Sequence, residues 1–225
     1  MPVLRKKGFL IVLIGLLASL ALAGCIAGAD TSNDTSGSLE YGGTALDGLA
    51  PDFRLVDHHG KSVALSDFRG RVVVLAFMDS RCDETCPLTA FELRTAHTSL
   101  GTIEKEVVFL GVNVNRNFNQ PKDTADFTAQ YSLEEIPTWH FLTGDPEQLE
   151  PVWRDYSIEV RPPAEPDEED FEHTPGVYVI DRDSDLRWYV STPLLEEGLV
   201  SPWTGPRLGE ILAARTRELL ALKAH

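Results

Sequence analysis

This chain of 225 residues has few positive charges, with 20 lysines and arginines against 35 aspartates and glutamates. The net charge is −15, and the sequence pI is about 4.7. Nucleic acid and anionic lipid are recognised by basic surfaces, so an acidic one argues against both as partners and permits cationic ones. The sequence shows no internal repeat, and its length and composition indicate one globular domain with appendages.

The apolar run at 8–23 is shorter than the about 20 residues of a typical membrane span. Residues 5–7 are basic, and residues 8–23 are uncharged and mostly apolar, which is typical of a secretory signal. The sequence Leu-Ala-Gly-Cys at 22–25 resembles a bacterial lipobox, in which Cys25 is lipidated and becomes the new N-terminus. An uncleaved membrane anchor is the alternative, and both predict a domain outside the cytoplasm on a membrane tether.

These features predict three regions. Residues 1–25 form a lipoprotein signal peptide, and residues 26–46 form a flexible tether, because the segment is rich in serine, threonine, glycine and aspartate. Residues 47–225 form the domain.

Cysteine is scarce, and once Cys25 is assigned to lipid only Cys82 and Cys86 remain. A structural disulfide normally joins distant segments, because closing a long loop constrains the unfolded chain more. A bridge across so short a spacing contributes little of that effect. The pair is therefore predicted to be functional, either as a redox disulfide or as two sulfur ligands for one soft metal ion.

The two cysteines follow an apolar run at 72–77 that is rich in β-branched residues and predicts a buried strand. After Pro87, which suits a first helical turn, apolar residues recur at helical spacing. The unpaired N–H groups and positive dipole end of a helix start favour the thiolate form of a nearby cysteine. Asp83 and Glu84, between the thiols, are expected to oppose it.

Strand patterns alternate with helical patterns along the domain, which predicts an α/β fold. Further strands are predicted at 51–57, 61–65, 107–114, 136–142, 177–180 and 187–191, and helices at 121–131, from 146 onward and at 206–223. A polar turn at 58–60 joins the first two strands as an N-terminal β-hairpin extension. Residues 161–170 contain three prolines and five carboxylates, which predicts a solvated loop with no packed element.

Histidine is the other candidate ligand type. His58 and His59 lie in the polar turn, and His97 and His140 lie in helical and strand patterns, so all four are interpreted as surface or packed side chains. His173 ends the acidic loop and precedes a strand. It is either a ligand or an ordinary loop histidine.

Residues 52–87 resemble the opening of thioredoxin-like proteins of the thiol-peroxidase and TlpA type, which share the layout of residues 65–70, an apolar strand and a cysteine. From Asp52 to about Ser191 the chain is similar to the SCO/SenC family, extracytoplasmic copper proteins linked to cytochrome c oxidase assembly. The matching pieces are Leu65-Ser66-Asp67-Phe68-Arg69-Gly70, Cys82-x-x-x-Cys86-Pro87, Asp123-Thr124, Phe141-Leu142-Thr143-Gly144, and His173 five residues before Tyr178.

This resemblance implies a thioredoxin-like fold, a central mixed β-sheet flanked by helices, with copper held by Cys82, Cys86 and His173. Thiolates are soft donors that select Cu(I), and one imidazole completes a low-coordinate site. Cu(II) is the alternative oxidation state of the bound copper. Zinc accepts the same donors but usually needs four ligands, and no fourth is evident in the sequence. The implied recipient is cytochrome c oxidase subunit II or another copper protein.

Some positions depart from the SCO/SenC pattern. Asp83 stands where the family usually has proline, and Val114-Asn115 stands where it reads valine-aspartate-proline. Pro175 lies six residues before Asp181, where TlpA-type reductases carry a cis-proline. A cis peptide bond beside the thiols would be a feature of thiol–disulfide exchange.

Two functions from different classes follow. The first is a metallochaperone that passes copper to the CuA site of cytochrome c oxidase and could also reduce its thiols. The alternative is a membrane-tethered thiol–disulfide oxidoreductase that uses Cys82 and Cys86 without a metal. A peroxiredoxin fits less well, because residues 79–81 lack its proline- and threonine-bearing approach to the cysteine. His173 discriminates between the first two, since thiol exchange does not require it.

Overall fold

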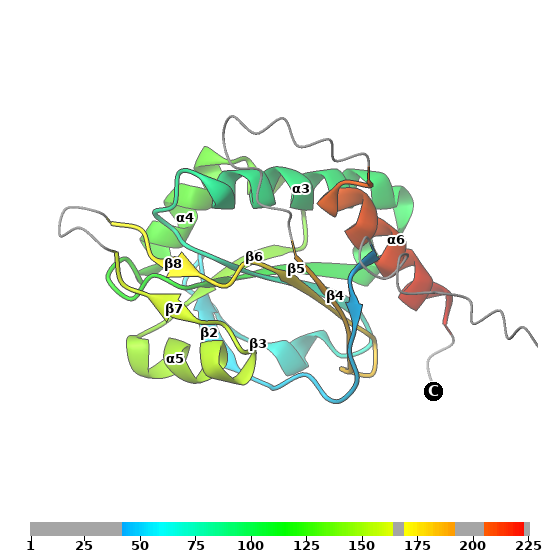
Figure 1. Ribbon diagram of the computed structural model, residues 1–225, viewed down its shortest axis with the longest axis horizontal. Helices are drawn as coiled ribbons and strands as arrows, with labels where there is room; N and C mark the ends of the chain where they lie inside the picture. Colours follow the sequence, from blue (N-terminus) through cyan, green and yellow to red (C-terminus); the bar gives the residue numbers. More distant parts are fainter. Residues whose placement is uncertain (1–41, 164–168, 192–204, 223–225) are drawn as a thin grey trace, which may run out of the picture. The chain divides into compact units, whose positions relative to one another are not determined.

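The two most continuous apolar runs of the sequence form neighbouring central strands of an eight-stranded sheet. β4 (Val72–Met78) and β5 (Val107–Asn113) are buried along their whole length and pair in parallel. Strands covered on both faces carry such unbroken apolar sequences. In the computed structural model the strand order is β1-β10-β9-β4-β5-β6-β2-β3 (Figure 1).

The structure describes residues 42–163, 169–191 and 205–222. The predicted signal segment, Cys25 and most of the predicted tether lie outside these ranges. β1 (Thr44–Ala45), at the end of the segment predicted as tether, pairs with β10. In the described part of the chain, no helix is long and apolar enough to cross a membrane.

The sheet is mixed, as predicted. β4, β5 and β6 run parallel, whereas β9 is antiparallel to β4 and β2 is antiparallel to β6. The hairpin predicted around residues 58–60 is formed by β2 and β3 at one edge of the sheet. The remaining main-sheet strands are β2 (Arg54–Asp57), β3 (Ser62–Ala64), β6 (Trp139–Thr143), β9 (Val177–Ile180) and β10 (Leu186–Val190).

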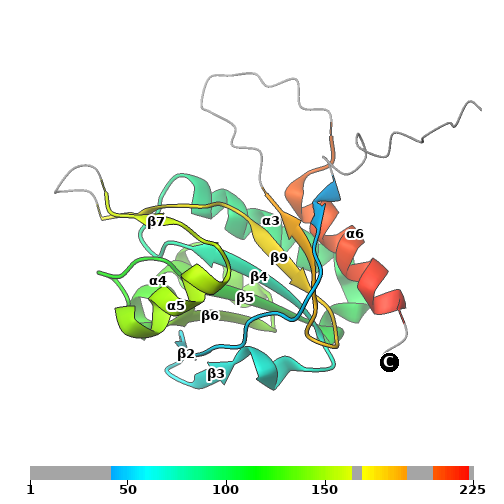
Figure 2. The ribbon, with the colours of Figure 1, turned by 60° about the horizontal axis from the view of Figure 1, so that its bottom comes forward.

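Helices cover both faces of the sheet (Figures 1 and 2). α3 (Thr85–Leu100), α4 (Pro121–Gln130) and α6 (Leu208–Ala221) pack on one face, where Leu93, Phe127 and Leu212 join one apolar core cluster. α5 (Pro146–Asp155) covers the other face through Leu149, Val152 and Trp153. The described residues also form the short 3-10 helices η1 (Leu65–Phe68), η2 (Gly101–Glu106) and η3 (Leu133–Glu135).

A second, two-stranded sheet was not expected from the sequence. β7 (Val160–Arg161) and β8 (Glu172–His173) pair in antiparallel fashion (Figure 1), with Val160 opposite His173. The prediction of a loop without any packed element at 161–170 is therefore wrong at its start, because Arg161 belongs to β7. Residues 164–168 lie outside the described ranges. We refer to β7 and β8 together as the small hairpin.

Candidate metal centre

Cys82, Cys86 and His173 lie beyond the same end of two neighbouring central strands. β4 and β9 are antiparallel neighbours in which Ala76, near the end of β4, lies opposite Val177, the first residue of β9. The loop after β4 carries Cys82, and the segment before β9 carries His173. The two parts of the candidate site, far apart in sequence, are thus brought together by one strand pair.

Helix α3 begins at Thr85, so Cys86 lies in its first turn and Cys82 in the loop before it. The Cys86 N–H donates a hydrogen bond to Cys82 Sγ at 3.4 Å, and the Asp79 N–H donates to Cys86 Sγ at 3.4 Å. Both cysteines are free thiols and both are buried. The helix start therefore supplies the Cys86 N–H to Cys82, as the sequence predicts, whereas the N–H that Cys86 Sγ accepts comes from the residue after β4.

The two thiols share a proton unequally. The Cys86 S–H donates a hydrogen bond to Cys82 and, together with backbone N–H groups and despite the opposing effect of burial, lowers the pKa of Cys82 to about 6. The same hydrogen bond and complete burial raise the pKa of Cys86. The expected opposition from Asp83 and Glu84 is outweighed, and the Glu84 backbone N–H itself lowers the pKa of Cys82. Cys82 is thus a thiolate at neutral pH.

His173 presents one ring nitrogen to the sulfurs. Its Nε2 lies 3.7 Å from Cys86 Sγ, and its Nδ1 lies 3.1 Å from the Thr174 carbonyl oxygen. A carbonyl only accepts hydrogen bonds, so Nδ1 carries the proton and Nε2 keeps its lone pair, the form that binds metal. Burial lowers the pKa of His173, which keeps the ring neutral.

The spacing of this pair can be compared with metal geometry. For zinc, bonds of about 2.3 Å to sulfur and about 2.0 Å to nitrogen, opened to a trigonal angle of about 120°, separate the two donors by about 3.7 Å. The observed distance from Sγ to Nε2 is 3.7 Å, so this pair fits one shared ion. Within the described ranges no group of three thiol, imidazole or carboxylate side chains is already arranged to hold a metal. A site that includes Cys82 therefore needs an adjustment of side chains.

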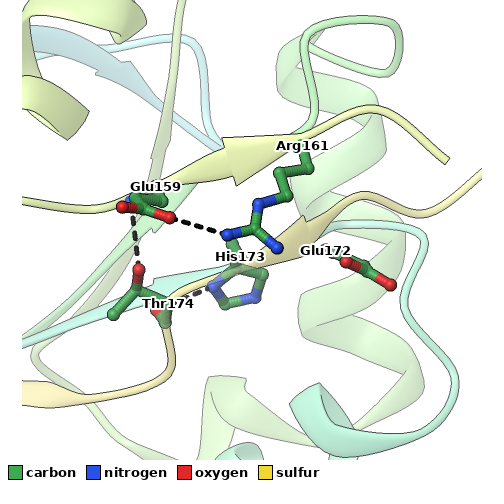
Figure 3. A pocket seen from close by; sticks show the side chains of 5 residues that line it. All are labelled: Glu159, Arg161, Glu172, His173 and Thr174. Atoms are coloured by element: carbon green, nitrogen blue, oxygen red, sulfur yellow. Dashed lines mark hydrogen bonds and ion pairs between the residues drawn. The ribbon is translucent and has the colours of Figure 1, made fainter.

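A cavity of about 170 Å³ lies against the small hairpin and is lined by Glu159, Arg161, Glu172, His173 and Thr174. Figure 3 shows the guanidinium of Arg161 beside the His173 ring, whereas the Glu172 side chain extends away from it. Arg161 is paired with Glu159, and the Thr174 hydroxyl accepts the Glu159 N–H. Glu159, the residue before β7, is thus linked both to Arg161 in β7 and to Thr174, the residue that follows His173.

The other described histidines are engaged elsewhere, as predicted. His58 Nδ1 accepts the Phe141 N–H at 3.1 Å, which leaves the proton on Nε2 and no free lone pair on the neutral ring. His140 Nδ1 lies 3.1 Å from a carboxylate oxygen of Asp57. The His59 ring packs on that of His58, and His97 packs edge-on against Phe109.

Asp79 and Asn115 are parts of the site that were missed in the sequence. Both are fully buried and hydrogen-bonded to each other, and burial raises the pKa of Asp79 to about 6. A signal for them was present, because each is a polar residue at the carboxyl end of a buried strand, β4 for Asp79 and β5 for Asn115. Parallel neighbouring strands end at one edge of a sheet, so such residues meet.

The peptide bond before Pro175 is trans, like all peptide bonds among the described residues. Gly176, the next residue, has φ of 150°, and a Cβ atom there would meet the Tyr189 ring at 2.3 Å. Glycine is therefore required where the chain passes from His173 into β9. This segment has its own close packing instead of the backbone feature of TlpA-type reductases.

Comparison with known proteins gives consistent matches. The model of the family described as SCO1/SenC matches residues 43–199. A mitochondrial SCO2 homologue from Bos taurus is 28% identical over 146 residues, which cover 62% of this chain and 53% of the relative. The chain thus spans about half the length of that relative.

Solved structures agree on the fold. The structure of Bradyrhizobium japonicum ScoI with copper bound has a TM-score of 0.60 and 21% identity, covering 76% of this chain and 99% of that one. BsSco, described as a member of the Sco family of cytochrome c oxidase assembly proteins with a disulfide switch, has a TM-score of 0.60 and 21% identity, covering 80% and 97%. The thioredoxin-like fold expected from the sequence is confirmed by these likenesses. With the family model covering the central sheet, both cysteines and His173, this chain belongs to the SCO1/SenC family.

Proposed function

We propose that this protein is a membrane-tethered, extracytoplasmic copper carrier that binds copper through Cys82, Cys86 and His173. Its cargo would go to the CuA site of cytochrome c oxidase subunit II, or to another copper protein. The observation that carries the proposal is the approach of His173 Nε2 to Cys86 Sγ at 3.7 Å. Relatives crystallised with copper support the choice of metal.

The donor set explains the preference for copper. Two thiolates and one neutral imidazole are soft and borderline donors that suit Cu(I), and a low-coordinate site lets a partner's thiols replace them one at a time. Cys82 is already a thiolate, so only the Cys86 proton has to leave when the metal binds. The pKa of His173 is lowered by burial, so no proton competes for its Nε2.

Thiol–disulfide exchange is the second candidate function, favoured by the unequal thiols. The Cys82 thiolate would attack a partner's disulfide and form a mixed disulfide with one partner sulfur, while the other leaves as a thiolate. Cys86, after losing its proton, would then attack Cys82 and release the partner's second thiolate. The partner disulfide is reduced, and Cys82 and Cys86 are oxidised to a disulfide. The same step would prepare oxidase cysteines for copper.

The tether is proposed from the sequence alone, with lipid on Cys25. Metabolic labelling of cells with a clickable fatty acid should label the wild-type protein, and the Cys25→Ser variant should carry no label. A labelled Cys25→Ser protein would contradict lipidation at that residue.

The test of copper binding uses the full chain, purified with its thiols reduced. Wild type should bind one equivalent of Cu(I) in competition with a chromogenic chelator, and His173→Ala should lose more than about tenfold in affinity, as metal-site changes commonly do. His140→Ala is the matched control, because that imidazole belongs to the Asp57 contact instead. Disulfide exchange should survive in His173→Ala. Equal copper affinity in His173→Ala and wild type would reject the three-ligand site and leave the dithiol exchanger.

A further inference from the structure

A buried polar link joins the loop that carries the cysteines to the segment that carries His173. Its members are Asp79, after β4, and Asn115, after β5, and both have a relative exposure of 0%. Buried carboxylate and amide groups are costly unless they are hydrogen-bonded, so their partners define what they hold in place.

Asp79 uses both of its carboxylate oxygens. Oδ1 accepts the Arg81 N–H at 2.7 Å, within the cysteine loop, and Oδ2 accepts the Phe171 N–H at 2.5 Å. Phe171 is itself buried and stands two residues before His173. One carboxylate thus connects the backbone next to Cys82 with the backbone next to His173.

Asn115 makes the same connection from the neighbouring strand. Its Nδ2 donates to Asp79 Oδ1 at 2.9 Å and to the Glu169 carbonyl at 2.7 Å. Its Oδ1 accepts the N–H groups of Asn117 and Phe118, which fixes the amide orientation. The segment before β8 is therefore held at Glu169 and at Phe171.

Other connections of the small hairpin leave its distance to the thiols less constrained. β8 pairs with β7 over two residues, so this pairing fixes one hairpin strand to the other. The salt bridge from Arg81 to Glu169 spans 3.8 Å and is partly exposed, which makes it weak. The buried link is the direct attachment of the hairpin to the cysteine loop.

We propose that Asp79 and Asn115 are positioning residues that hold His173 Nε2 close enough to Cys86 Sγ for both atoms to bind one copper ion. This inference rests on the proposed three-ligand copper site and adds the residues that preorganise it. With the link intact the ring is already in place when copper arrives; without it, the hairpin has to be ordered on binding, which lowers affinity.

Two variants break the link and change the charge of the site in different ways. Asp79→Ala removes a negative charge together with the acceptor of the Phe171 N–H. Asn115→Asp sets a second carboxyl group against that of Asp79, so that the two repel each other or share a proton; it keeps the acceptor for Asn117 and Phe118 and removes the amide donor to Asp79 and Glu169. Because only Asp79→Ala takes negative charge away from the site, a loss of copper affinity in both variants is not explained by one change in the electrostatics of the thiols. If Asp79→Ala does not fold, Asn115→Asp carries the test.

A matched control removes a buried polar contact elsewhere in the same region. Thr143 is fully buried at the end of β6, and its hydroxyl donates to the Asn119 carbonyl at 2.8 Å. Thr143→Val loses that bond and the 3.4 Å contact from Asn113 Nδ2 to the same hydroxyl, and it leaves the contacts to Glu169 and Phe171 intact. Its copper affinity should stay within twofold of wild type.

The decisive measurement combines each variant with His173→Ala, as a double-mutant cycle. In the full chain with His173 present, Asp79→Ala and Asn115→Asp should each lower Cu(I) affinity by about 10- to 100-fold. In the His173→Ala background they should change it less than about twofold. In the copper-free protein, hydrogen exchange of the amides at 169–173 should accelerate in both variants and not in Thr143→Val.

Each other result overturns a specific statement. Wild-type affinity in both link variants, or an equal loss with and without His173, would show that the link does not act through the imidazole. Unchanged amide exchange at 169–173 would show that it does not hold the hairpin. If His173→Ala alone binds copper like wild type, the proposed function fails, and the exchange data alone decide whether the link fixes the hairpin.

Discussion

His173 and His140 are both partly buried imidazoles held through Nδ1, and they sit in different chemical surroundings. The Nδ1 of His173 meets a backbone carbonyl and its Nε2 faces Cys86 Sγ, whereas the Nδ1 of His140 meets the Asp57 carboxylate. We call these the thiol–imidazole site and the Asp57 clamp. The comparison teaches that a histidine is assigned by what each ring nitrogen contacts, and neither residue type nor burial separates the two.

The hydrogen bonds of the Asp57 clamp indicate a structural role in the turn between β2 and β3. Asp57 is 1% exposed, and its Oδ1 accepts the N–H groups of His59 and Lys61 across the turn between β2 and β3. Burial raises the pKa of Asp57, but these N–H groups and His140 outweigh it, so the pKa lies below its ordinary value. The carboxylate therefore stabilises the turn.

The largest expected difference between the two regions is in copper binding. Cys86→Ser should lower Cu(I) affinity by more than about 100-fold, because a ligand contributes more than the surrounding shell. Asp57→Asn should leave it unchanged. Chelator competition on the two full-length variants measures both effects, and a comparable loss in Asp57→Asn would break the assignment of separate roles.

For the stability of the fold, the larger effect is expected in the Asp57 clamp and not in the thiol–imidazole site. Asp57→Ala leaves the partly buried N–H groups of His59 and Lys61 and the His140 ring without their acceptor, which should cost about 1–3 kcal/mol of unfolding free energy. Copper affinity should not change. Denaturant unfolding of the copper-free protein checks this, with Asp57→Asn as the milder control, because an amide oxygen keeps one acceptor. A loss below 0.5 kcal/mol, on the order of an ordinary surface change, would contradict the clamp.

The thiol–imidazole site should titrate near neutrality. Alkylation of Cys82 by iodoacetamide should rise with pH and reach half its maximum near pH 6, the value to which its pKa is lowered. Cys86→Ala should move this midpoint upward, since the Cys86 S–H is the main cause of the lowered pKa. His173→Ala should leave it in place. Mass spectrometry of quenched samples gives the profile, and a midpoint near that of a free cysteine would refute the thiolate.

The smallest effect should be the pH dependence of the clamp. A carboxyl group whose folded pKa is depressed contributes stability above its unfolded pKa, near 3.8 for Asp57, and loses it as the pH falls through the folded pKa. The stability difference between wild type and Asp57→Asn should therefore be full at pH 6 and shrink below pH 3.8. Thermal unfolding across this range tests it, and a constant difference would remove the electrostatic part of the clamp.

Most of the fold could be predicted from local sequence patterns. The unbroken apolar runs gave β4 and β5 to within a residue, and the Pro-led helices α4 and α5 begin where predicted. The strand predicted at 136–142 is shorter and later, at Trp139–Thr143, because Leu133–Glu135 forms a 3-10 helix and Ile136 follows it. The small hairpin escaped, since two-residue strands carry no periodicity.

The sequence by itself determined the two thiols at a helix start, the alternation of strands and helices, and the ligand candidate His173, because these depend on residue type and on contacts close in the chain. Only the tertiary structure decided that His173 Nε2 faces Cys86, that Nδ1 carries the proton, and that Asp79 and Asn115 join the two loops. Those features arise where β4 and β5 end and the antiparallel β9 begins. No local pattern encodes such a meeting, because it depends on how distant strands pair.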